Sequence, residues 1–285
     1  MIRISALILT LTLLFSGICF AQEDVVAGPY TYYVNSTRPN NSGDGLGPST
    51  AWKNLSYALA NSVTNDFIVV SPGTYNSDMG ENFPIGISGQ KVLSSSTHLA
   101  TIEESGSPVY IVTMGDNSSL EGFHLKGDGN SSAIFCTGSN VVIKNNIIDA
   151  SNYLNGIYLD NVAPYITISI DSNSIFSASS YGLRTFGQKT TLINNEIRNV
   201  PIGAYIFPLG GNNNQAVIYK NTFTKISNIG LEVRVNAETF QWASAYNNII
   251  SGESGATKGL SSALDGFVRT YNNDIYGFAA NWSGA

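Results

Sequence analysis

The sequence predicts an all-β protein, a right-handed parallel β-helix of about seven or more coils with a short helical cap at its N-terminal end. Two short tags recur in fixed order, and successive copies of the first lie 22 to 27 residues apart. The segments between them alternate apolar and polar residues and are rich in β-branched side chains, as strands are. Strands this short cannot bury a face alone, so a repeat of this length is typical of coils stacked into a solenoid.

The first tag places an asparagine one or two residues before an isoleucine or phenylalanine. The variable spacing between copies fits insertions into loops, which solenoids tolerate. We expect each asparagine side chain to bond to the asparagine of the next coil and so satisfy buried turn amides. The expected ladder consists of Asn146, Asn173, Asn195, Asn221, Asn248 and Asn273.

The second tag is a glycine or alanine followed by an apolar residue. Because side chains alternate across a strand, the residue after the small one points inward and the next points outward. The inward positions are Ile134, Ile157, Leu183, Ala204, Leu231 and Leu260.

The first residues read as a secretory signal. Arg3 precedes an apolar run, Ile4 to Phe20, which ends in the small-x-small pattern Cys19-Phe20-Ala21. This layout predicts a signal peptide at residues 1–21 and a protein that is secreted or held at the cell surface, with no membrane insertion after cleavage. We further divide the chain into a cap module with the first coils at 22–100 and β-helix repeats at 101–285.

Cys136 is the one cysteine left after signal removal, so no internal disulfide is expected. We expect Cys136 to be a small buried residue rather than a nucleophile.

The end of the sequence predicts a longer natural protein. The chain stops at Ala285 with a coil under way, and no polar or amphipathic closing segment follows Ala263. A solenoid end without a cap exposes strand edges and core side chains. We therefore expect further coils after Ala285, and end-to-end association of the chain as it stands.

Charge restricts the partners. The chain carries 20 acidic and 14 basic residues, a net charge of −6, and loss of Arg3 with the signal leaves 20 against 13, or −7. Affinity for nucleic acid depends on neutralising phosphates, so this balance argues against a nucleic-acid partner.

The residues before the repeat follow a recognisable order. Tyr32-Tyr33-Val34 precedes a glycine-rich loop at Gly43-Asp44-Gly45, an amphipathic stretch at 51–60, a strand at Asp66–Val70 and the motif Pro72–Tyr75. Over about residues 30–76 this order resembles the N-terminal module of uncharacterised function that opens many secreted bacterial β-helix proteins, including family 9 pectate lyases. The resemblance implies the pectin-lyase-like fold and a role with extracellular polysaccharide.

The resemblance also implies a lysine base beside a calcium ion held by grouped aspartates. Apart from the pairs Glu23-Asp24 and Glu103-Glu104, which lie outside the repeat, the acidic residues of this chain are scattered singly, whereas hard cations need several converging oxygens. No metal site and no cofactor are assigned from the residues, and calcium is implied by the resemblance alone. The tandem aspartates of β-helical polygalacturonases are also missing, which leaves enzymatic activity open.

Alignment on the second tag produces a candidate surface. Two adjacent outward files of aromatic and charged side chains would suit sugar rings, whose apolar faces lie on aromatic rings while their hydroxyls meet polar groups. The alternative is a set of ordinary cross-strand pairs without function. The expected substrate-binding residues are Tyr158, Phe186, Tyr205, Phe207, Glu232 and Arg234.

Catalysis has weaker support on this face. Asp160 and Glu232 are three coils apart, or about 14 Å, whereas a glycosidase dyad needs its carboxyls about 5–9.5 Å apart. Asp160 with Arg184 is the candidate catalytic pair of a lyase, although an arginine base requires a deprotonation that proteins rarely allow. We expect an exported β-helix that binds extracellular or cell-wall polysaccharide. The alternatives are a polysaccharide lyase of unrecognised type and a non-catalytic structural or adhesin module.

Overall fold

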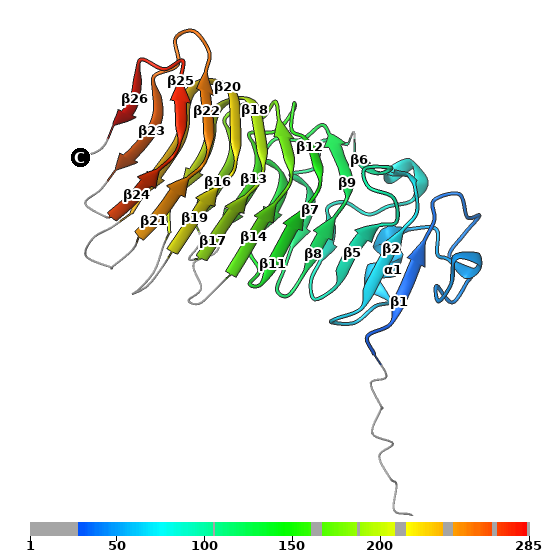
Figure 1. Cartoon of the computed structure of the whole chain (residues 1–285). Coiled ribbons are helices and arrows are strands. Elements are labelled where there is room, and N and C mark those ends of the chain that lie inside the picture. The colour runs from blue at the N-terminus through cyan, green and yellow to red at the C-terminus, as the bar shows by residue number, and fades with distance from the viewer. Residues whose placement is uncertain are drawn as a thin grey trace, which may run out of the picture.

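Short parallel strands, stacked coil upon coil, make up almost the whole molecule (Figure 1). The computed structural model describes residues 28–104, 106–160, 167–186, 189–208, 215–235, 242–263 and 267–283. The signal peptide expected at 1–21 lies outside these residues. The predicted fold class, an all-β parallel β-helix with very little helix, is confirmed.

Each coil contributes to three walls of strands. The first wall is a sheet of ten described strands, which are β1 (Thr31–Val34), β2 (Phe67–Val70), β5 (Lys91–Ser94), β8 (Ser119–Glu121), β11 (Val141–Lys144), β14 (Thr167–Asp171), β17 (Lys189–Ile193), β19 (Gln215–Tyr219), β21 (Trp242–Tyr246) and β24 (Phe267–Tyr271).

The second and third walls are joined into one sheet of sixteen described strands, because β18 (Glu196–Ile206) and β20 (Thr222–Arg234) run through the corner between them. The second wall also contains β3 (Gly73–Tyr75), β6 (Ala100–Glu104), β9 (Phe123–Gly127), β12 (Ile147–Asp149), β15 (Ser174–Phe176), β22 (Ile249–Gly252) and β25 (Asp274–Tyr276). The third wall also contains β4 (Ile85–Ile87), β7 (Tyr110–Met114), β10 (Ser132–Cys136), β13 (Asn155–Asp160), β16 (Tyr181–Phe186), β23 (Lys258–Ala263) and β26 (Ala280–Ser283).

The core runs down the middle of the solenoid and is built from the inward half of each alternating strand. The residues that follow the small residue of the second tag, from Ile134 to Leu260, are at most 1% exposed. Burial of these aliphatic side chains provides the main driving force for stacking, at about 1.5–3 kcal/mol for each fully buried residue.

The corner between the first and second walls has the same backbone in successive coils. The residue before the ladder asparagine has a positive φ of 54° to 57° in six coils, although none of the six is a glycine. This left-handed conformation costs a non-glycine residue roughly 1–2 kcal/mol, so the corner needs compensation from its hydrogen bonds. The six residues are Asn145, Ser172, Asn194, Lys220, Asn247 and Asn272.

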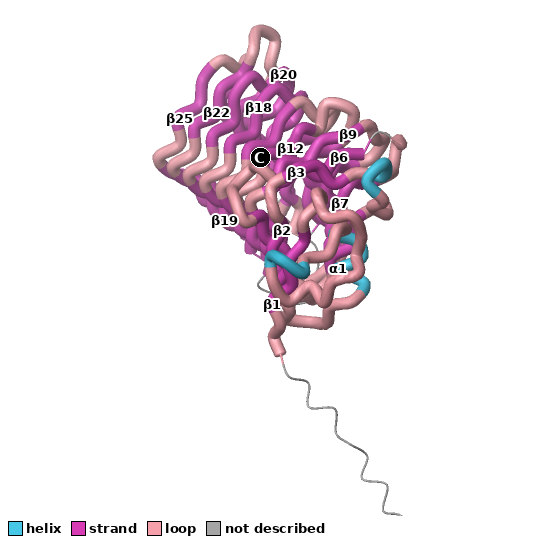
Figure 2. Tube along the Cα trace, turned by 90° about the vertical axis from the view of Figure 1, so that its right-hand side faces the viewer, coloured by secondary structure: helices cyan, strands magenta, loops and turns pink. Residues whose placement is uncertain are grey.

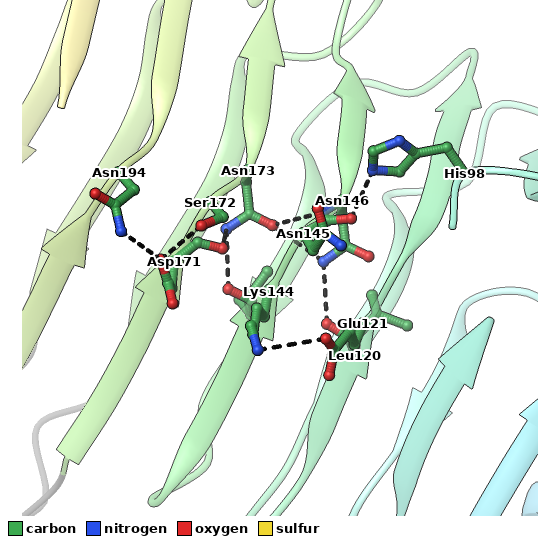
Figure 3. Close-up of polar contacts among 11 residues, drawn as sticks. His98, Leu120, Glu121, Lys144, Asn145, Asn146, Asp171, Ser172, Asn173 and Asn194 are labelled. Atoms are coloured by element: carbon green, nitrogen blue, oxygen red, sulfur yellow. Dashed lines mark hydrogen bonds and ion pairs between the residues drawn. The ribbon is translucent and has the colours of Figure 1, made fainter. Parts of the chain in front are cut away.

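The asparagine that follows supplies those bonds (Figure 3). Asn173 Oδ1 accepts from both the backbone N and the Nδ2 of Asn146, at 3.0 and 3.1 Å. Asn173 Nδ2 donates to the carbonyl of Ile143 at 2.9 Å and to Asn195 Oδ1 at 3.0 Å. The same pattern repeats at every step from Asn146 to Asn273.

In the coil before Asn146 the corner has no ladder asparagine, and Gly122 and Phe123 occupy the equivalent positions. Gly122 takes the left-handed position, with φ of 82°, and the backbone N of Phe123 donates to Asn146 Oδ1 at 2.9 Å. His98, from the loop between β5 and β6, donates through Nε2 to the carbonyl of Asn145 at 2.7 Å (Figure 3).

A short helix and its loops cover the N-terminal end of the core (Figure 2). Helix α1 spans Leu55–Ala60, which is shorter than the amphipathic stretch at 51–60. The difference arises because Trp52 pairs with Val34 as an added strand position, and its ring stacks on Tyr32 at 4.9 Å. The buried carboxylate of Glu81 accepts from the backbone N of Leu55 and Ser56 at 2.7 and 2.8 Å, so it caps the helix.

Across the described residues, no helix is long and apolar enough to cross a membrane.

The ladder predicts a large loss of stability for Asn195→Ala. The substitution removes the donor that lies 2.8 Å from the carbonyl of Ile170 and the acceptor of the backbone N of Asn173, whereas the carbonyl of Ile193 keeps its bond from the backbone N of Ser172. Unsatisfied buried groups cost about 1–3 kcal/mol each, so we expect a loss of roughly 3 kcal/mol or more. The midpoint of guanidinium unfolding measures it, with Asn82→Ala, an exposed asparagine, as the control. Equal midpoints for the two variants would show that the ladder does not contribute to stability.

Candidate functional site

The outer face of the third wall carries the aromatic and charged residues singled out in the sequence. Strand pairing aligns Tyr158 of β13 with Arg184 of β16, then with Tyr205 of β18 and Glu232 of β20. A neighbouring file begins with Asp160, which pairs with Phe186. The two files therefore lie side by side across four coils.

Aromatic rings make a connected chain over this face. Phe135 contacts Tyr158 at 5.5 Å, Tyr158 contacts Phe186 at 6.1 Å, and Phe186 contacts Phe207 at 6.0 Å between ring centroids. These contacts are tilted or edge-on, with interplanar angles of 43° to 79°. Such contacts leave part of each ring face uncovered, and these residues are partly exposed.

Tyrosines of the first wall are packed differently. Tyr219, Tyr246 and Tyr271 stack face to face, with centroids 5.1 and 4.8 Å apart and interplanar angles of 9° and 7°. Each ring covers the next, so the middle ring presents only its edges. This stack provides a natural comparison for the third-wall aromatics.

Arg184 occupies the centre of the third-wall face. Its guanidinium carbon lies 5.3 Å from the ring centroids of Tyr158 and Tyr181 and 4.8 Å from that of Phe186. Its Nε atom is buried and donates to no acceptor among the residues that the structure describes. Three rings therefore surround a cation whose Nε has no acceptor in the described part of the chain.

Arg234 is neutralised, in contrast to Arg184. Its Nε and Nη2 atoms both lie 2.8 Å from Glu232 Oε1, and its guanidinium lies 5.3 Å from the Tyr205 ring. This hydrogen bond to Glu232 is the main reason that the pKa of Arg234 is raised. The pair contributes no net charge to the face.

Tyr205 and Glu232 are less exposed than the sequence suggests. Both side chains point away from the core, yet Tyr205 is only 9% exposed and Glu232 only 8%. Tyr205 is covered by Tyr181, Phe186 and Arg234, with ring centroids of the two aromatics 5.8 and 5.7 Å away. The expectation that both residues are open on the surface was wrong, because outward side chains of adjacent coils cover one another.

Asp160 and Arg184, the candidate catalytic pair, lie on adjacent coils but are offset by one file. In the part of the chain that the structure describes, no ion pair joins them. The Asp160 carboxylate instead accepts from the Tyr158 hydroxyl, and burial followed by the nearby Asp160 charge raises the pKa of Tyr158.

Two aromatic residues of the face were missed in the sequence. Tyr110 stacks on Phe135 at 4.4 Å with an interplanar angle of 9°, and Tyr181 contacts both Tyr205 and Arg184. Each begins its strand. Tyr181 stands directly before the glycine of the second tag, so its position in the repeat was available as a signal.

Metal-binding side chains do not converge within the described ranges. No group of three or more histidine, cysteine or carboxylate residues there could hold a metal ion.

Comparisons with known proteins bear on the fold. Residues 38–98 match the family described as "Protein of unknown function (DUF1565)". No curated protein sequence matches the chain. Among solved structures, the Dettilon tailspike protein (gp208) is similar with a TM-score of 0.53 and 13% identity, over 82% of this chain and 47% of that one. The PL6 family alginate lyase AlyGC is similar with a TM-score of 0.52 and 13% identity, over 89% and 40%.

The chain has the parallel β-helix fold. A match to pectate lyase Pel9A, with a TM-score of 0.42 and 16% identity, covers 87% of this chain and 79% of that one. The chain spans less than half the length of the tailspike and alginate lyase structures. At these identities the solved structures show the fold alone, while the DUF1565 match agrees with the N-terminal module recognised in the sequence.

Cys136 lies on the inward side of β10, and its burial predicts that the thiol is unreactive. It is fully buried, and burial raises its pKa to about 12. Because the thiolate is the reactive form, we expect Cys136 in a Cys19→Ser chain to be unreactive toward a disulfide reagent at pH 8 and to react on unfolding in urea. The rate of thiol labelling measures this, with the urea-unfolded chain as the control. Labelling of the native chain at the unfolded rate would contradict it.

Proposed function

We propose that the outer face of β13, β16, β18 and β20 binds extracellular or cell-wall polysaccharide. The observation that carries the proposal is the connected chain of partly exposed, tilted rings from Tyr158 through Phe186 to Phe207, with the Arg184 guanidinium lying among them. Sugar rings place their apolar faces on aromatic rings and their hydroxyls against charged or polar groups. Four coils at about 4.8 Å per coil give a contact length of roughly 14 Å, enough for several sugar units.

The six proposed binding residues divide into two roles. Tyr158, Phe186, Phe207 and Arg234 are accessible enough to touch a ligand. Tyr205 and Glu232 are covered, so their role is to hold Phe186 and Arg234 in place. Arg184 joins the contact residues because its guanidinium lies between rings that would themselves meet the sugar.

The alginate lyase and the tailspike supply the fold only, so the proposal depends on the side chains of this chain. The signal peptide expected at 1–21 supports a place outside the cell, where such polymers occur. The net charge of −6 speaks against nucleic acid as the partner.

Substitution of the accessible rings tests the binding face. We expect Phe186→Ala with Phe207→Ala to weaken binding to the best ligand of a polysaccharide array by about tenfold or more, because two stacking surfaces are lost. Tyr246→Ala, which removes an aromatic ring from the middle of the first-wall stack, serves as the matched control and should bind as the parent does. Affinity is measured by biolayer interferometry after circular dichroism has shown that each variant is folded.

Other outcomes distinguish the alternatives. Loss of binding in the control but not in the double variant would contradict the proposed face. Absence of binding to every polymer would favour a structural or adhesin module. Unsaturated sugar ends, detected by ultraviolet absorbance after incubation with uronate polymers, would identify a lyase.

A further inference from the structure

The charges on the proposed binding face are arranged unevenly, and among the described residues Arg184 is its one cation without an ion pair. Four ionisable groups of opposite sign occupy the two files: Asp160, Arg184, Glu232 and Arg234. Glu232 and Arg234 neutralise each other at 2.8 Å. Within the described residues Arg184 forms no ion pair, and its buried Nε has no acceptor.

The surroundings of Arg184 restrict how it can be satisfied. Rings of Tyr158, Tyr181 and Phe186 lie within 5.3 Å of the guanidinium carbon and offer no strong acceptor along its edge. The side chain is nevertheless partly exposed, so a ligand can reach it. A planar guanidinium with free donors pairs best with a carboxylate, sulfate or phosphate, which accepts two parallel hydrogen bonds.

The neighbouring coils disfavour a second anion. On the side of β13 the exposed Asp160 carboxylate would repel an anionic group. On the side of β18 and β20 the cation of Arg234 is already paired with Glu232. A polymer with an acidic group on every sugar would bring several anions onto a face whose described residues include one cation without an ion pair, and the chain as a whole is acidic.

We propose that the face recognises a polysaccharide with isolated acidic substituents, in which one anionic group binds Arg184 and the flanking sugar units are uncharged. This inference rests on the proposed polysaccharide binding and specifies the class of polymer. It excludes homopolymers of uronic acid as the best ligands. The ligand runs across the strands, so that its neutral units lie on Phe186 and Phe207 or on Tyr158.

The experiment compares matched polymers whose charge alone differs. Gellan, in which neutral sugars separate each uronate from the next, is compared with carboxyl-reduced gellan, and lightly sulfated dextran with its parent dextran. Polygalacturonate supplies the densely charged polymer. We expect native gellan or lightly sulfated dextran to bind about tenfold or more tightly than its uncharged counterpart and than polygalacturonate. The better of the two pairs identifies the anion as a carboxylate or a sulfate.

Variants then attribute the preference to Arg184. Arg184→Gln should abolish the preference, so that the variant binds the charged polymer and its uncharged counterpart equally. Arg198→Gln is the matched control, since Arg198 also lies on a ring, 4.3 Å from the Phe176 centroid, but belongs to the second wall and pairs with Glu196 at 3.6 Å. It should keep the full preference.

Each remaining result overturns a defined part of the account. Equal binding of charged and uncharged partners, or tightest binding of polygalacturonate, would overturn the inference and leave polysaccharide binding intact. A preference that persists in Arg184→Gln would also overturn it. Failure of all five polymers to bind would overturn the proposed function together with the inference. The polymer comparison uses the unaltered chain, so it holds even if a variant does not fold.

Discussion

The hydrogen bonds of the buried asparagine corner fix how each coil lies on the next. The oxygen of one side chain accepts from the backbone and side-chain nitrogens of the preceding ladder residue, while its own nitrogen donates to carbonyls of that coil and its own. A slip of one residue would break all of these bonds and turn every inward side chain outward. Because the corner holds the left-handed residue before it, register and backbone shape are set together.

A fixed register explains why the outer face exists despite loops of variable length. Coils differ from 22 to 27 residues between tags, yet Tyr158, Arg184, Tyr205 and Glu232 stay aligned. The glycines of the second tag contribute, because a Cβ at Gly156 or Gly182 would lie 2.3 Å from an isoleucine methyl group of the next coil. The glycine therefore lets the backbone at the start of the third wall pass close to the next coil. The walls keep the same geometry in successive coils, and insertions are confined to the loops. The rings and charges of the face can then stack across coils.

Periodic features were accessible from the sequence, and features that depend on neighbouring side chains were not. The tags identify the ladder asparagines and the inward residues, since each role recurs in every coil. Alternation also assigns Tyr205 and Glu232 to the outer side, but they are only 9% and 8% exposed. This low exposure depends on neighbours, which are Tyr181, Phe186 and Arg234 around Tyr205 and Arg234 beside Glu232. Whether Arg184 forms an ion pair also depends on neighbouring side chains, since Asp160 lies in the adjacent file and pairs with Phe186 rather than with Arg184. A sequence pattern gives the direction of a side chain, whereas packing determines whether a ligand can touch it.

Hydrogen exchange at the corner tests most directly whether the ladder holds the coils in register. The backbone amides of Asn146, Asn173, Asn195 and Asn221 donate to a side chain of the next coil rather than to a strand. The account predicts that these amides are protected as strongly as the core strands and exchange only when the molecule unfolds. The amide of Leu46 donates to the exposed side chain of Asp44 in a surface loop, where water can compete for it, so it should exchange much faster in the same experiment. Exchange of the corner amides at the rate of Leu46, with the strands still protected, would show that the walls stack without the ladder and would contradict the account.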